Sequence, residues 1–157
     1  MSAQTGPEWW FYHLERSSLE RAAAPLIEKC LERDWRVLVV SANAERRARL
    51  DEALWSWRDD SFLPHGEAGA EGLDPARQPV LIAPEPENLN TASVALLLDG
   101  TRLEPQAGFT RCMVMFDGSD TQTRSIARDQ FKAARQAGLT CRYYQQTPSG
   151  GWQKAGG

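Results

Sequence analysis

The sequence predicts an α/β protein with three layers, α/β/α, built on a Rossmann-like and mainly parallel sheet. Short apolar segments rich in β-branched residues, such as 36–41 (RVLVVS) and 80–83 (VLIA), are typical of strands buried on both faces. Segments with helical periodicity alternate with these strands, which favours right-handed crossovers between parallel neighbours. The 157 residues suffice for one domain with a substantial core.

The first strand and helix are expected near the N-terminus. Residues 8–14 (EWWFYHL) predict a strand. Ser17 and Glu20 have the spacing of a capping box, and apolar residues recur at helical intervals from Leu19 onwards. Because Pro25 lies inside this pattern, we expect a kink or a later start of the helix.

A second helix should follow the strand at 36–41, with Asn43 as its N-cap. Its apolar stripe comprises Leu50, Ala53, Leu54 and Trp57. Trp55 lies about 100° or more away from this stripe at the helical pitch. The Gly- and Pro-rich segment 66–79 is expected to be a mobile loop.

The C-terminal half predicts a third helix over 120–137, ended by Gly138. The strands expected in this half are 80–83, 93–99, 111–117 and 139–144. We assign residues 1–145 to a single domain and residues 146–157 to a flexible C-terminal tail, because the tail is rich in glycine.

The composition narrows the class of protein. With 18 basic and 21 acidic residues the formal charge is -3, which disfavours sequence-independent binding to duplex DNA. Cys30, Cys112 and Cys141 lie far apart in apolar segments, as expected for reduced thiols in a cytoplasm. The N-terminus lacks the basic and apolar regions of a signal peptide, and no apolar run approaches the ~20 residues of a membrane span.

The sequence gives little indication of an enzyme. The turns after the first two strands, LERSS and SANAE, lack the glycines of a phosphate-binding loop, so we expect no nucleotide cofactor. The histidines and cysteines lack the spacing of a metal site, and we expect none. His65 could act as a general base. A structural role, in which it bonds the nearby loop backbone, is favoured because no nucleophile and carboxylate converge on it in sequence.

The third helix carries the most informative pattern. One face holds a basic stripe with an aromatic residue inside it: Arg124, Arg128, Phe131, Lys132 and Arg135. An aromatic ring among cations suits an acidic peptide that ends in a free carboxylate. Alternatively, the stripe is a solvated face and Phe131 folds down onto the sheet. The expected core face comprises Ile126, Ala133, Ala134 and Ala137.

A second candidate surface surrounds the end of the second helix. Trp55 lies off the core stripe, and Phe62, Leu63 and Pro64 follow. Together these side chains could form an exposed apolar surface, where a tryptophan is a natural anchor for a protein partner. Alternatively, they seal an edge of the sheet.

These segments resemble a known family. RLDEALWSWRDDSFLPHGEAG and IARDQFKAARQAGLT are similar to the corresponding runs of the chi subunit of the bacterial DNA polymerase III clamp loader. The resemblance extends from FYHL to CRYY and includes the order of strands and helices. It implies a Rossmann-like fold without a demonstrated nucleotide requirement, and a cytoplasmic bacterial protein acting at the replication fork.

The resemblance also implies partners and sites. It implies a non-catalytic subunit that pairs with the psi subunit through Trp55, Phe62 and Pro64. By resemblance, the acidic C-terminal tail of single-stranded DNA-binding protein, which ends in a phenylalanine carboxylate, binds a pocket on the third helix. The pocket residues implied are Arg124, Arg128, Phe131 and Lys132. DNA would be contacted only indirectly, with no membrane and no small-molecule substrate.

Two positions depart from the family pattern. The family commonly has tyrosine where this chain has Phe131, and often lysine where Arg124 stands. Two other functions remain open: a small α/β enzyme with His65 as base, and a direct single-stranded DNA binder that stacks bases on Phe131.

Overall fold

A computed structural model describes residues 7–56, 64–149 and 151–154. Within them, one sheet has the strand order β3-β4-β2-β5-β6-β1-β7-β8. The strands are β1 (Glu8–Leu14), β2 (Val37–Val40), β3 (Gly66–Glu67), β4 (Val80–Ala83), β5 (Val94–Leu97), β6 (Arg111–Asp117), β7 (Cys141–Gln146) and β8 (Trp152–Lys154). The helices are α1 (Leu19–Glu32), α2 (Ala44–Trp55), α3 (Thr121–Gln136) and the short 3-10 helix η1 (Pro75–Arg77).

The sheet is parallel except at one end, where β8 runs antiparallel to β7. Its central strands β2, β4 and β5 are buried at every position, as their continuously apolar sequences require. The predicted α/β fold with a mainly parallel sheet is confirmed. None of the helices in the described part of the chain is long and apolar enough to cross a membrane.

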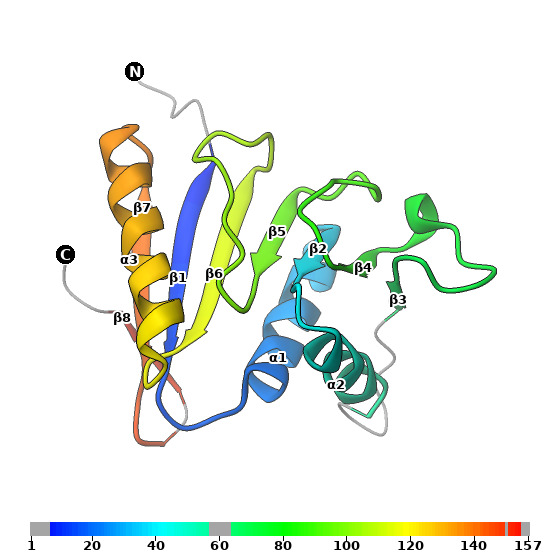
Figure 1. The fold of residues 1–157 in the computed structure, drawn as a ribbon, viewed down its shortest axis with the longest axis horizontal. Helices are drawn as coiled ribbons and strands as arrows, with labels where there is room; N and C mark the ends of the chain where they lie inside the picture. The colour runs from blue at the N-terminus through cyan, green and yellow to red at the C-terminus, as the bar shows by residue number, and fades with distance from the viewer. Residues whose placement is uncertain (1–6, 57–63, 150, 155–157) are drawn as a thin grey trace.

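Two crossovers in opposite directions create the outer layers. The chain passes from β1 through α1 to β2, across β6 and β5, and later from β6 through α3 to β7, across β1. Because such crossovers are right-handed, opposite directions place the helices on opposite faces. Accordingly, α1 and α2 pack into one apolar cluster and α3 into the other. Figure 1 shows α3 lying along β1 and β7, at the opposite end of the sheet from α2.

The start of α1 differs from the prediction. Ser18, not Ser17, is the N-cap, and its Oγ accepts a hydrogen bond from the backbone N–H of Arg21 at 3.3 Å. Ser17 instead accepts a bond from the Gln146 side chain. The helix begins at Leu19 and runs through Pro25, so the expected later start is wrong.

Two segments expected to be irregular contain structure. The predicted loop 66–79 holds β3 and η1, and the guanidinium of Arg36 fixes it by donating to the carbonyls of Ala76 and Gln78 at 2.8 and 3.0 Å. In the segment expected to be a flexible tail, residues 152–154 form β8, which pairs antiparallel with β7, and the ring of Trp152 lies 5.2 Å from that of Tyr12. Both expectations came from glycine content, which does not report such long-range contacts.

The described cysteines are free thiols within or beside the two apolar clusters. Burial raises the pKa of Cys30 to about 11 and that of Cys112 to about 12. Such thiols stay protonated near neutral pH and behave as small apolar side chains, as the sequence predicts.

Candidate functional site

Helix α3 begins after Asp120, which the sequence placed inside the helix, and ends before Gly138 as predicted. The Asp120 side chain caps the N-terminus by accepting from the backbone N–H groups of Gln122 and Thr123 at 3.0 and 3.4 Å. After the C-terminus, Gly138 takes a φ of +80°, a left-handed conformation that glycine adopts without strain.

The buried face of α3 is partly the predicted one. Ala134 is buried and Ile126 and Ala133 are half-buried, but Ala137 is exposed, because it already lies at the C-cap. The buried residues that sequence reasoning missed are Ala127 and Gln130. Gln130 tolerates burial because its amide bonds the loop across it, accepting from Leu103 N–H at 3.1 Å and donating to the Thr101 carbonyl at 3.2 Å.

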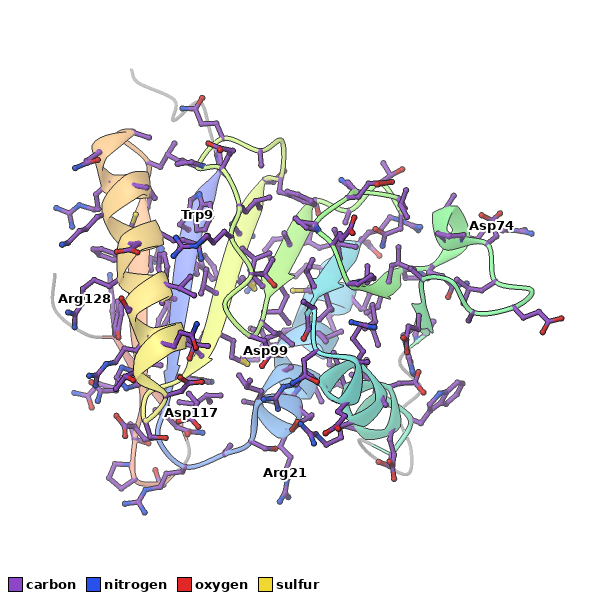
Figure 2. All side chains as sticks on the ribbon, in the orientation of Figure 1. Trp9, Arg21, Asp74, Asp99, Asp117 and Arg128 are labelled. Atoms are coloured by element: carbon purple, nitrogen blue, oxygen red, sulfur yellow. The ribbon has the colours of Figure 1, made fainter. Side chains whose placement is uncertain are left out.

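The α3 stripe consists of Arg124, Arg128, Phe131, Lys132 and Arg135, and its four basic residues are exposed. Figure 2 shows Arg128 reaching outward from α3. Phe131 is half-buried and leans on the sheet, with its ring edge-to-face with Phe11 at 5.3 Å. The alternative in which Phe131 folds onto the sheet therefore describes its position, and the ring forms the floor of the stripe rather than a projecting anchor.

Tyr143 is a neighbour of the stripe that sequence reasoning missed. Its ring lies 6.1 Å from that of Phe131, in an edge-to-face arrangement. Burial raises the pKa of the Tyr143 phenol, while the nearby charges of Arg128 and Arg124 act in the opposite direction. A tyrosine on β7 thus borders the same cations as Phe131. The alternation of side chains along 139–144 was the available signal, but it could not show that β7 lies beside α3.

The hydroxyl of Tyr143 contacts the imidazole of His13 on the neighbouring strand β1. It lies 2.8 Å from Nδ1 of His13, whose Nε2 lies 3.0 Å from a carboxylate oxygen of Glu15. The imidazole also excludes a side chain at Gly118, where a Cβ would come within 1.9 Å of Nε2. His13 therefore has a structural role, as predicted.

The second candidate surface, the Trp55 patch, consists of Trp55, Phe62 and Pro64. Trp55 ends α2 and is 56% exposed, whereas Leu54 beside it is fully buried. The predicted divergence of Trp55 from the core stripe is confirmed. Pro64 is half-buried, and Phe62, like Trp57 of the predicted stripe, lies outside the described residues.

The buried side chain of His65 packs against the ring of Trp55. Its imidazole is buried, with Nε2 2.9 Å from a carboxylate oxygen of Asp51 and its ring 4.8 Å from that of Trp55. Asp51, one turn before Trp55 on α2, is thus a partner of His65 that sequence reasoning did not anticipate. Among the described residues, no group of three His, Cys, Asp or Glu side chains is arranged to hold a metal ion.

The carboxyl edge of β2 and β5, where Rossmann-like folds commonly bind ligands, is filled by ion pairs. Arg46 contacts the carboxylates of Glu20 and Asp99, the latter at 3.2 Å. Burial disfavours the charge of Glu20, but its hydrogen bonds and the charge of Arg46 outweigh burial and lower its pKa. This network ties α1, α2 and the end of β5 together.

Comparison with known proteins identifies the family. The family model for the DNA polymerase III chi subunit, HolC, matches residues 7–142. The probable DNA polymerase III subunit chi of Rickettsia prowazekii is 25% identical over 150 residues, which is 91% of this chain and 88% of the relative. The chi subunit of Escherichia coli is 32% identical over 105 residues, covering 66% and 69%, and that of Pseudomonas aeruginosa is 28% identical over 118 residues, covering 75% and 80%. The chain belongs to the DNA polymerase III chi subunit family.

Proposed function

We propose that this chi subunit is a non-catalytic adaptor of DNA polymerase III. In this proposal the Trp55 patch binds the psi subunit of the clamp loader, and the α3 stripe binds the acidic C-terminal tail of single-stranded DNA-binding protein. The observation that carries the proposal is the composition of the α3 stripe, where exposed cations surround a half-buried aromatic ring on an acidic protein.

The α3 stripe supplies the groups that such a tail requires. Arg128 lies one helical turn from both Arg124 and Lys132 and offers a planar guanidinium to the terminal carboxylate. Phe131 and Tyr143 supply an apolar wall for the terminal phenyl ring. Arg124 and Lys132 attract the acidic residues that precede it. Tyr143 also brings a hydroxyl to a site where this chain has phenylalanine at position 131.

The Trp55 patch has a different composition. The exposed indole of Trp55 is large and apolar, and His65 with Asp51 holds it at the end of α2. An aromatic residue on a rigid element is a typical hot spot of a protein interface. The buried imidazole of His65 gives the small-enzyme alternative no support, because a general base must reach its substrate.

Titration of a peptide that copies the acidic tail tests this proposal. We expect the peptide to bind the wild-type chain, to bind Arg128→Ala about tenfold or more weakly, and to bind Arg77→Ala normally. Arg77 is a matched exposed arginine on η1. Unchanged affinity of Arg128→Ala would show that the stripe is only a solvated face. Binding of single-stranded DNA, lost in the same variant, would favour the direct-binder alternative.

A further inference from the structure

A groove of about 460 Å³ lies between α1 and the end of the sheet formed by β1, β7 and β8. It opens on the face opposite α3, because side chains alternate along each strand. Phe11 and Tyr143 face α3, whereas Tyr12 and Tyr144 face the groove. The groove is therefore separate from the α3 stripe.

Five aromatic side chains line the groove on the sheet side: Trp10, Tyr12, Trp35, Tyr144 and Trp152. Tyr144 stacks on Tyr12 with ring centroids 5.3 Å apart, and Trp152 closes on the edge of Tyr12 at 5.2 Å. Trp152 is 37% exposed, which is unusual for so large an apolar side chain. An open, mostly apolar concavity of this size is typical of a binding surface.

Helix α1 forms the other wall with one stripe of residues at helical spacing: Ala22, Pro25, Leu26, Lys29, Cys30 and Arg33. Pro25 and Leu26 are half-buried, while Lys29 and Arg33 are exposed at the rim. Among the described lining residues, these two are the charged ones, and both are basic. The groove therefore favours a ligand with acidic groups beside an apolar one.

One end of the groove is a stack of alternating arginine and tryptophan side chains. The guanidinium of Arg111 lies 4.3 Å from the ring centres of both Trp10 and Trp35. Arg142 and Arg33 cover the outer faces of the two indoles, at 5.4 and 5.1 Å. The stack holds this wall in place and adds positive charge beside Lys29.

The stack contains three arginines, and in the described part of the chain Glu8 is the acidic side chain that contacts it. Glu8 accepts from the indole N–H of Trp10 and lies 3.8 and 3.7 Å from Arg111 and Arg142. One carboxylate does not neutralise three guanidinium groups, so positive potential extends toward the groove and adds to the attraction for an acidic ligand.

The shape of the walls favours a peptide over a nucleic acid. Guanidinium groups cover the faces of Trp10 and Trp35, so bases cannot stack there. The opposite wall is aliphatic, with Pro25, Leu26 and Met113, as suits a bulky apolar side chain. In addition, β8 is an edge strand, whose outer backbone groups an extended peptide could pair.

We propose that this α1 groove docks an acidic peptide segment of a protein partner, which inserts a bulky apolar side chain between α1 and Tyr144. The surface is distinct from the α3 stripe and from the Trp55 patch. The docked peptide needs no free C-terminal carboxylate, because the basic residues of the groove lie along its rim and not around a closed end.

Selection from a random peptide library displayed on phage tests this inference. Each peptide is joined to the coat protein through its C-terminus, so that a site requiring a free carboxylate is not sampled. The full chain is the bait, and the Leu26→Asp variant is used for counter-selection. The enriched peptides are then synthesised with blocked ends and titrated into each variant.

We expect acidic sequences with a bulky apolar residue to be enriched. Their affinity should fall about tenfold or more in Leu26→Asp and in the double variant Lys29→Glu with Arg33→Glu. The double variant changes exposed residues only, so it covers the case in which Leu26→Asp does not fold. Arg77→Glu is the matched control at the other end of the sheet and should bind normally.

Three results would overturn the inference. The first is a selection without an acidic and apolar consensus. The second is an enriched peptide that binds the double variant as tightly as the wild-type chain. The third is a sedimentation experiment in which Leu26→Asp abolishes self-association of the wild-type chain, since the groove would then hold a second copy.

Discussion

Phe131 and Trp55 are both large aromatic residues on amphipathic helices, and both lie off the stripe that the sequence assigns to the core. The surroundings and the exposure of the two rings differ. Phe131 is in the middle of α3, and its ring leans against Phe11 and Tyr143. Trp55 ends α2, where the only described ring beside it is that of His65, and more than half of it is exposed.

The two surfaces that we propose to bind partners are built in different ways. On α3 the aromatic ring is part of the fold, and the exposed cations around it supply the chemistry. On α2 the ring itself is the exposed element, and a buried pair, His65 and Asp51, holds it from behind. A change at Phe131 should therefore affect stability and binding together, whereas a change at Trp55 should affect binding alone.

Substitutions at the neighbouring residues Leu54 and Trp55 should differ most in their effects on stability and on binding. Leu54→Ala is expected to lower the free energy of unfolding by about 2–5 kcal/mol, because Leu54 is fully buried. Trp55→Ala should leave the free energy of unfolding within about 0.5 kcal/mol of wild type and weaken psi binding by about 2 kcal/mol or more. Chemical denaturation and calorimetric titration with psi measure the two quantities. If Trp55→Ala unfolds the chain, the Trp55 patch is part of the core.

Phe131→Ala should have an intermediate and mixed effect. We expect it to lower the free energy of unfolding by about 1–3 kcal/mol, below the range for fully buried phenylalanine, because the ring is half-buried. It should also weaken binding of the acidic tail peptide. Denaturation and peptide titration on the same sample separate the two losses. A loss of binding at unchanged stability would show that Phe131, like Trp55, contributes to binding and not to the fold.

Tyr143→Phe should have a smaller effect on stability. The substitution removes the hydroxyl that lies 2.8 Å from Nδ1 of His13, and we expect a loss of about 0.5–1.5 kcal/mol in the free energy of unfolding. Thermal denaturation measures this loss. The control is Tyr144→Phe, because Tyr144 lies on the opposite face of β7. A chain as stable as wild type would show that the His13 contact does not support the α3 side.

Lys132→Ala should have the smallest effect. Lys132 is exposed, so we expect it to contribute about 0.2–1 kcal/mol to binding of the tail peptide. The loss should appear mainly as a slower association rate and a weaker dependence on salt. Stopped-flow measurements at two salt concentrations check this. A faster dissociation with an unchanged association rate would instead mean that Lys132 makes a close contact.

Local sequence patterns predict local structure well in this chain. The apolar runs at 80–83 and 111–117, the Asn43 cap and the exposure of Trp55 all depend on nearby residues. Sequence reasoning missed contacts between distant residues. The ring of Trp152 in β8 lies beside that of Tyr12, and the buried amide of Gln130 bonds the loop after β5.

For the candidate sites, too, local patterns could be predicted and contacts between distant residues could not. The basic residues of the α3 stripe could be found from helical spacing, and the family resemblance is confirmed by the match over residues 7–142. Helical spacing left two positions open for the Phe131 ring and gave no indication of Tyr143, because both depend on how α3, β1 and β7 pack. Binding of psi and of the acidic tail stays a prediction.

We propose that the α3 stripe and the Trp55 patch are independent surfaces for two different partners. The most direct test measures the affinities of psi and of the acidic tail peptide for the Trp55→Ala and Arg128→Ala variants. We predict that Trp55→Ala loses psi and keeps the peptide, and that Arg128→Ala loses the peptide and keeps psi. A variant that loses both ligands while remaining folded, or competition between the two ligands for the wild-type chain, would contradict the account.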